Sequence, residues 1–171
     1  MHTPESIYKQ FQLLNDWFIS ALEGISDEDG KKTLGDAMNS LEWLAGHLVV
    51  GRYRNMLRVG MQVEPYQHLD TFINQSIPPP NAIAFDPNIT YPSLAESRET
   101  WIHYSTLFLA RLKEIDAAGL TTEIPFHVPT GGNTVKDALA FTVMHETYHI
   151  GQMSTMRKML GYGSMQLGPR K

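Results

Sequence analysis

Cysteine is absent from this chain, and its absence excludes several kinds of chemistry. Disulfide bonds, thiolate metal ligands and a nucleophilic protein thiol are all ruled out. Any thiol that takes part in a reaction must therefore arrive with the substrate.

Basic residues are also scarce. The sequence has 14 Lys and Arg against 18 Asp and Glu, which gives a formal net charge of -4 at pH 7. No basic stripe stands out that could follow a phosphate backbone or an anionic membrane surface. We therefore expect neither a nucleic acid nor a membrane as a partner.

Long apolar runs are missing as well. Residues 1–17 are amphipathic and include acidic side chains, so they have neither the apolar segment nor the basic flank of a secretory signal. No run approaches the length of a membrane span. A cytoplasmic location is the default expectation.

What the chain does contain fits one compact domain. Of its 171 residues, 42% are hydrophobic. That is enough for a single core and leaves little room for a second. We therefore expect residues 1–171 to form a single domain.

Apolar side chains recur every three or four residues in four segments, which is the period of an α-helix. The first predicted helix runs from about residue 4 to about residue 24. The Ser-Asp-Glu-Asp-Gly cluster at residues 26–30 that follows it favours turns over helix. Three more predicted helices begin at residues that resemble N-caps: Asn39 (ending near 60), Ser93 (ending near 116) and Thr134. The pattern predicts an all-α bundle of four helices.

Two long connections separate these helices. Residues 61–91 are dense in proline, which removes backbone donors and predicts a connection that returns the chain across the bundle. Residues 121–132 mix β-branched residues, prolines and glycines, which predicts an extended excursion before the last helix.

The last predicted helix carries two histidines on one apolar face. His145 and His149 are four residues apart, so both rings can reach one ion. Because an unpaired imidazole is costly among apolar side chains, each ring nitrogen needs a metal or a hydrogen-bond acceptor.

A third ligand is expected from upstream. The segment after His149 contains no His, Asp or Glu that could complete a site in the manner of zinc proteases. His47 lies on the apolar face of the second predicted helix, whereas His68, His103 and His127 are expected to be solvated or locally bonded. We therefore predict one divalent metal ion on His47, His145 and His149, with coordination positions left open.

Two segments of the sequence resemble the signature segments of a known family. They are LEWLAGHLV, which contains His47, and HETYHIGQMSTMRKMLG, which contains a His-x-x-x-His-x-Gly-Gln pattern. In order and separation they are similar to the DinB-like (damage-inducible, YfiT-related) superfamily of bacterial metalloenzymes, and the similarity covers nearly the whole chain. The resemblance implies a four-helix bundle whose second and third helices are parallel. It also implies zinc, nickel or iron on three histidines, and frequent homodimers.

Two further polar residues lie near the histidine pair. Glu146 either acts as a general base, as in zinc proteases, or is a supporting or surface carboxylate, since it lies about 100° from His145 around the helix axis. Gln152 shares the histidine face, where it can orient a ligand or a polar group of the substrate, or make an interhelical hydrogen bond.

Four more residues are candidates for binding a substrate. Arg54 falls two turns after His47 on the same face and can hold a carboxylate of a substrate or thiol, although a solvated arginine fits the pattern equally well. Trp43, Trp101 and Tyr104 can line a pocket, or they can be ordinary core residues at helical spacing.

Three functional hypotheses follow. The family resembled here includes transferases and isomerases that use low-molecular-weight thiols, so the first hypothesis is a metal-dependent transferase that activates such a thiol for a small-molecule substrate. The second is a hydrolase that uses metal-bound hydroxide, with Glu146 as the base. The third is a non-enzymatic, metal-binding stress-response module, against which open coordination argues.

Overall fold

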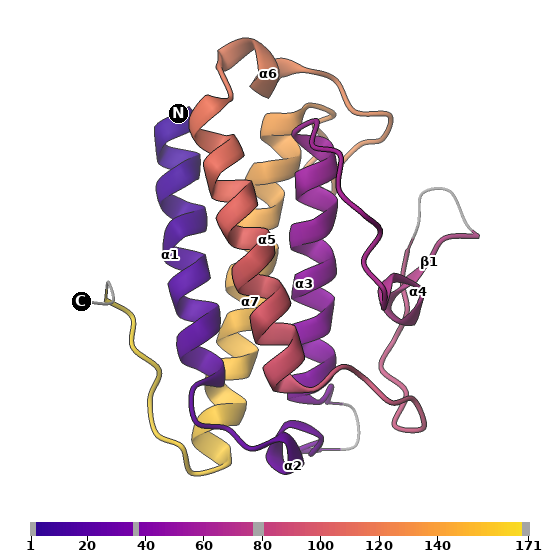
Figure 1. Ribbon diagram of the computed structural model, residues 1–171, viewed down its shortest axis with the longest axis vertical. Coiled ribbons are helices and arrows are strands. Elements are labelled where there is room, and N and C mark those ends of the chain that lie inside the picture. The colour runs from indigo at the N-terminus through magenta and orange to yellow at the C-terminus, as the bar shows by residue number, and fades with distance from the viewer. Residues whose placement is uncertain (1–2, 36–37, 77–80, 169–171) are drawn as a thin grey trace.

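Four long helices carry the fold of the described residues, which are 3–35, 38–76 and 81–168 of the computed structural model (Figure 1). They are α1 (Pro4–Leu22), α3 (Leu41–Arg58), α5 (Leu94–Glu114) and α7 (Val135–Met159). Each corresponds to one of the four helices predicted from sequence periodicity, and the all-α prediction is confirmed.

Local capping explains where these helices begin. At α1 and α7, Thr3 and Thr134 each accept a hydrogen bond from a backbone amide three residues later, and the bond is returned in a capping box. Ser93 caps α5 by accepting from the Glu96 amide at 3.1 Å.

The start of α3 corrects one prediction. Ser40 caps this helix, with its hydroxyl accepting from the Trp43 amide at 3.2 Å, so the helix begins one residue later than the capping box at Asn39 implied. The capping hydrogen bond is thus accepted by the Ser40 hydroxyl from the Trp43 amide, in place of the bond expected between Asn39 and Glu42.

Shorter elements fill the connections. A single helical turn, α2 (Asp27–Gly30), stands where turns were expected to replace helix, because Ser26 caps it and acidic side chains favour the positive end of its dipole. The connection that follows α3 contains the short helix α4 (Leu69–Phe72) and an antiparallel pair of strands, β1 (Ile73–Asn74) and β2 (Asn81–Ala82), in which Ile73 pairs with Ala82.

The connection that follows α5 starts with α6 (Ala117–Thr121) and then becomes extended. Glu123 forms an antiparallel bridge with Thr134, and the Ile124 amide donates to the Asn133 carbonyl at 2.7 Å. This agrees with the extended excursion predicted for residues 121–132.

The helix directions confirm the parallel pairing that the family resemblance implied. In Figure 1, α1 and α7 run downward, whereas α3 and α5 run upward side by side. Helix α1 packs against α5 and α7, and α3 packs against the same two helices. Because α3 and α5 are parallel, the chain between them must return along the length of the bundle, which is why that connection is long.

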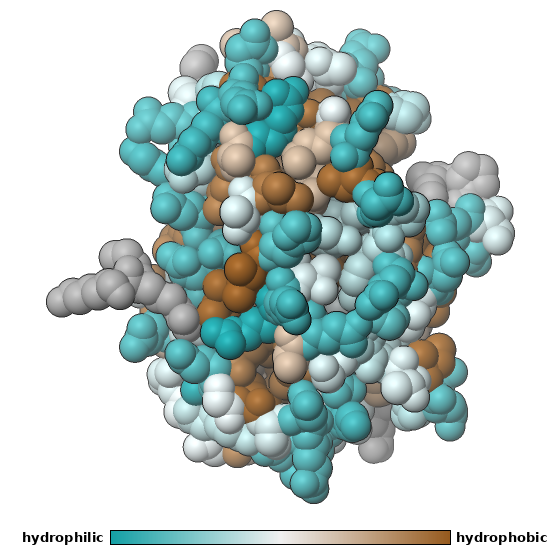
Figure 2. All heavy atoms as spheres, viewed as in Figure 1, coloured by the Kyte–Doolittle hydropathy of each residue, from teal (hydrophilic) through white to brown (hydrophobic). Residues whose placement is uncertain are grey.

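Aromatic side chains fill much of the core. The Phe18 and Trp101 rings stack with centroids 4.1 Å apart, and Phe11 meets Phe108 edge to face at 5.0 Å. On the face shown in Figure 2, hydrophilic side chains dominate and apolar atoms show mainly between them. Within the described ranges, no helix has both the length and the apolar character needed to cross a membrane.

A close contact fixes α4 against α3. Gly46 lies under the Phe72 ring so closely that any side chain at this position would overlap the ring, and Phe72 is fully buried. The glycine thus allows the long connection to dock beside His47, the next residue of α3.

Candidate metal centre

Three imidazoles from two helices meet at one point. His47 comes from α3, and His145 and His149 come from successive turns of α7. The Nε2 atom of His145 is 3.1 Å from that of His47 and 3.2 Å from that of His149, and one nitrogen of each ring lies within 4.8 Å of the others. Two imidazole nitrogens bound to one zinc ion at tetrahedral angles are about 3.3 Å apart, so the spacing fits a shared divalent cation.

Neighbouring side chains hold two of these rings. Gln152 Oε1 lies 2.7 Å from His149 Nδ1 and can only accept, so that nitrogen donates and the Nε2 lone pair faces the other histidines. The Gln152 amide in turn donates to the Tyr148 hydroxyl at 3.2 Å. The His47 ring stacks on Trp43, with centroids 4.8 Å apart and an interplanar angle of 7°.

All three histidines are held in the neutral form, which is the form that can bind a cation. Burial, together with the positive charges of His145, His149 and Arg54, lowers the pKa of His47 to about 3. Burial, together with the positive charges of His149, Arg58 and Arg54, lowers the pKa of His145 to about 4. Burial also lowers the pKa of His149, although its hydrogen bond to Gln152 opposes the shift.

A cavity of about 500 Å³ opens onto His47 and His145. Helices α3 and α7 form two of its sides, and residues from the β1–β2 pair and from the connection after α6 form the rest. Arg54 and Arg58 line it, and the described residues of the lining include no Asp or Glu. The cavity therefore combines a candidate metal centre with a positive electrostatic potential.

Glu146 does not lie at this cavity. Its side chain is fully buried in the core and receives hydrogen bonds from Arg52, at 2.8 Å from Nη2 and 3.3 Å from Nε. The Arg52 guanidinium also lies 4.2 Å from the Trp101 ring centroid. Burial raises the pKa of Glu146, and the charge of Arg52 opposes that shift. This placement fits a supporting ion pair between α3 and α7; it fits neither a surface carboxylate nor a base that contacts a substrate.

The remaining candidate residues are divided between the cavity and the core. Arg54 lines the cavity, Gln152 bonds to His149 within α7, and Trp43 supports His47. Trp101 lies in the core against Phe18, away from the cavity.

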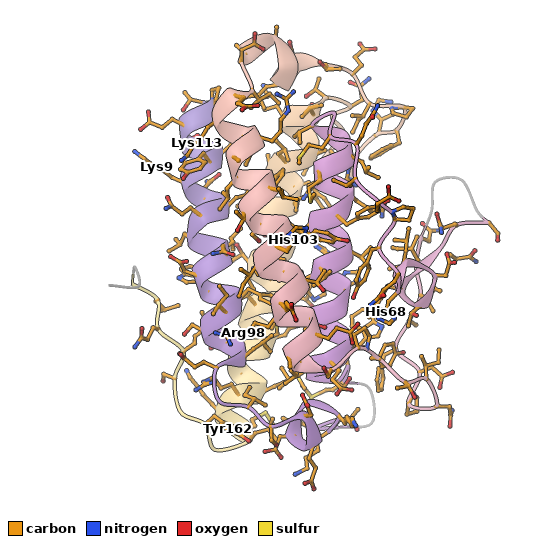
Figure 3. All side chains as sticks on the ribbon, viewed as in Figure 1. Lys9, His68, Arg98, His103, Lys113 and Tyr162 are labelled. Atoms are coloured by element: carbon orange, nitrogen blue, oxygen red, sulfur yellow. The ribbon has the colours of Figure 1, made fainter. Side chains whose placement is uncertain are left out.

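Tyr104 contributes to a different, more open cavity of about 470 Å³ beside α5. His103, labelled in Figure 3, lines the same cavity and projects from the exposed side of α5. Tyr104 is therefore not part of the metal centre.

Sequence reasoning missed several residues that line the cavity, Arg58 and Phe126 among them. It expected His127 to be solvated or locally bonded, and the His127 Nδ1 atom does lie 3.1 Å from the Gly131 carbonyl, although the residue also lines the cavity. Arg58 follows Arg54 by four residues, so the shared helical face was a signal that could have found it. Phe126 and His127 come from the extended connection after α6, where no periodicity predicts which side chains turn inward.

The bundle and the converging imidazoles define a class of protein: a four-helix bundle with a candidate three-histidine metal centre. A sequence model of the DinB superfamily matches residues 10–153. The chain belongs to the DinB superfamily.

Solved structures share this fold at low sequence identity. A DinB-like protein from Bacillus cereus superposes with a TM-score of 0.69 at 17% identity, covering 99% of this chain and 98% of the other. YfiT from Bacillus subtilis, described as a probable metal-dependent hydrolase with an unusual four-helix bundle topology, has a TM-score of 0.62 at 17% identity, covering 95% and 92%. The DinB-like protein YjoA from Bacillus subtilis has a TM-score of 0.63 at 16% identity, covering 94% and 95%. A comparison with curated proteins finds no match.

Proposed function

We propose that this protein is a metal-dependent transferase, in which His47, His145 and His149 hold one divalent cation, zinc, nickel or iron, and a low-molecular-weight thiol is the nucleophile. The sulfur would form a bond to an electrophilic carbon of a second small molecule, whose leaving group would depart with the electron pair of the broken bond, while the thiol proton would leave to solvent. A bound cation would lower the pKa of a coordinated thiol or water and polarise a bound carbonyl.

The observation that carries this proposal is the combination of groups around one cavity. His47 and His145 lie at one end with His149 beside them, two guanidiniums line the wall, and no carboxylate is found among the described lining residues. A thiol ionises far more readily than water, so it needs no strong base from the protein. The chain has no cysteine of its own, so a thiol nucleophile must come from solution.

Individual side chains have defined tasks in this scheme. Gln152 and Trp43 orient two of the imidazoles, and the apolar part of the wall, including Phe126 and Phe141, excludes water from the reacting groups. Arg54 supplies positive charge beside the histidines.

Hydrolysis is the second candidate. Three histidines leave coordination positions that water can occupy, and the YfiT structure is described as that of a probable metal-dependent hydrolase. Glu146 is an unsuitable base for this reaction because Arg52 holds it in the core. His127, which lines the cavity, would be the candidate base.

The metal site is tested by elemental analysis of untagged protein. We expect roughly one equivalent of metal in the wild type and little in His47→Ala and His149→Ala, because loss of one ligand from a set of three weakens binding sharply. His103→Ala is the matched control, since His103 is exposed on α5, and it should keep its metal. Equal metal content in all four proteins would refute the site.

The reaction class is tested on cobalt-substituted protein. A thiol that coordinates the metal should change the visible absorption spectrum, and the protein should then consume thiol together with an electrophile. Turnover of generic esters without thiol would instead establish the hydrolase. Neither activity, together with folding that does not depend on metal, would favour the non-enzymatic module.

We also propose that two copies associate. Large apolar side chains are exposed along one side of α7, with Met144 at 63%, Tyr148 at 64% and Met159 at 58% exposure. An apolar row of this kind on one helix is typical of an interface between subunits.

A further inference from the structure

We propose that the arginine-lined part of the cavity is an anion-binding subsite, and that the thiol used here carries at least two carboxylates, which Arg54 and Arg58 bind together. The choice of a thiol rests on the proposed function, whereas the anion subsite does not.

Arg54 lacks a partner within the part of the chain that the structure describes. Its side chain is half-buried in the cavity wall and makes no hydrogen bond or ion pair there. Burial lowers the pKa of Arg54, because removing a guanidinium from water disfavours its charged form. A half-buried guanidinium with five donors and no acceptor is stabilised when a ligand supplies the acceptor.

Arg58 is held in place beside it. Its Nη1 donates to Asn55 Oδ1 at 2.6 Å, and its guanidinium lies 5.5 Å from the Phe126 ring centroid. Both neighbours are uncharged, so they orient Arg58 without neutralising it. Burial, together with the charge of Arg54, lowers the pKa of Arg58 to about 10.

The two arginines therefore destabilise each other until an anion binds. Both line one cavity, and each carries a positive charge at neutral pH. The other titratable residues of the described lining are His47, His145 and His127, and none of them supplies negative charge. A ligand with a single negative charge would leave one guanidinium uncompensated, whereas two carboxylates match both.

The position of the arginines relates the subsite to the candidate metal centre. Arg54 follows His47 by seven residues on α3, a rise of roughly 10 Å along the helix axis. Long helical side chains lean toward the N-terminus, so the Arg54 guanidinium reaches back toward the histidines. Arg54, His47 and His145 line the same cavity, which agrees with this placement. One small molecule can therefore reach the histidines with its sulfur and the arginines with its carboxylates.

The test compares two thiols on cobalt-substituted protein. Mercaptosuccinate carries two carboxylates, and 2-mercaptoethanol carries none. Spectral titration should show mercaptosuccinate binding at least about tenfold more tightly to the wild type, as expected for charge-assisted hydrogen bonds. Arg54→Gln and Arg58→Gln should each remove most of this preference, because each should lower the affinity for mercaptosuccinate far more than the affinity for 2-mercaptoethanol. Arg98→Gln is the matched control, because Arg98 is exposed on α5 away from the cavity (Figure 3).

A second measurement separates the subsite from the thiol reaction. Metal-free wild-type protein should be stabilised by succinate, with a rise in Tm that both arginine substitutions abolish and Arg98→Gln keeps. Stabilisation by succinate without any spectral response to thiols would support the subsite and refute the thiol transferase. Thiol binding with the same preference for mercaptosuccinate in the wild type and in both variants would place the preference at the metal and overturn the subsite. If a glutamine variant fails to fold, the absence of succinate stabilisation in the wild type is sufficient to overturn it.

Discussion

At the scale of single residues, the candidate metal centre depends on side chains that do not themselves reach a cation. Gln152 fixes the protonated nitrogen of His149 through one hydrogen bond, and the Tyr148 hydroxyl fixes the orientation of the Gln152 amide. Such supporting contacts set the tautomer of a ligand and hold its ring in the geometry that binding requires.

Removing this support should weaken metal binding without abolishing it. For Gln152→Ala we expect a loss of about 10- to 100-fold in zinc affinity, because the His149 ring then becomes free to rotate. Competition with a chromophoric chelator measures the affinity. Gln12→Ala, at an exposed position of α1, should bind zinc like the wild type. An unchanged affinity in Gln152→Ala would show that the hydrogen bond has no role in the centre.

Glu42 provides a prediction about pH. Its side chain is 3% exposed, and its Oε1 has no hydrogen-bond partner among the described residues. Burial raises the pKa of Glu42 above its ordinary value of 4.5, so the folded protein binds a proton more readily than the unfolded chain. The stabilisation that this protonation gives is complete at low pH and is lost as the pH rises through the folded-state pKa.

Glu42→Gln should therefore gain stability relative to the wild type as the pH rises from about 4 to about 8. An uncharged amide avoids the cost of burying a carboxylate. At the upper end of this pH range we expect the variant to be more stable than the wild type by roughly 1 kcal/mol, or about 3 °C in Tm. Thermal unfolding of both proteins across the range measures the difference. A gap that does not change with pH would contradict the raised pKa.

At the scale of the helices, the ion pair between Arg52 and Glu146 links α3 to α7 behind the histidines. Both side chains are completely buried, and the guanidinium lies between aromatic rings, 4.2 Å from the Trp101 centroid and 5.0 Å from that of Phe11. A buried ion pair adds little net stability, because removing both charges from water costs about as much as their attraction gains. Loss of one partner is costly, however, because it leaves an uncompensated charge in the core.

We therefore expect Glu146→Gln to destabilise the fold by about 3–5 kcal/mol. The double variant Arg52→Met, Glu146→Met should recover most of that loss, because two apolar side chains of similar length fill the same space. Urea unfolding measures both effects. The double variant should also keep its metal. If the double variant folds and keeps its metal but has lost turnover, Glu146 takes part in catalysis.

The helices themselves were largely predictable from the sequence because their signals are local. Capping at Thr3, Ser93 and Thr134 needs only residues three positions apart, so it can be recognised without knowledge of the fold. At the start of α3, two adjacent residues can both cap, and the choice of Ser40 over Asn39 was not evident from sequence.

Non-local features were not predictable in the same way. The β1–β2 pair has two residues in each strand, which is too short for a periodic signal, and it is supported by the packing of Phe72 on Gly46. The three histidines were proposed from their apolar faces and from a family resemblance. The pairing of Glu146 with Arg52 joins residues 94 positions apart, and local patterns carry no information about it.

At the scale of the whole molecule, the exposed apolar row on α7 predicts self-association. Light scattering coupled to size-exclusion chromatography should give the mass of a dimer for the wild type. Met144→Lys should give a monomer, because a lysine placed in an apolar interface loses hydration without gaining a partner. Ile102→Lys, on the exposed side of α5, is the control and should remain dimeric. A monomeric wild type would contradict the predicted homodimer.

The distance in sequence between His47 and His145, 98 residues, determines when a cation can bind during folding. The site exists only after the two halves of the chain have docked, so zinc should slow unfolding while leaving the refolding rate unchanged. Stopped-flow measurements with and without zinc would show this, and faster refolding with zinc would contradict it. An ion that binds last cannot guide the chain to its native topology. The packing of the helices must then determine that topology without help from the metal.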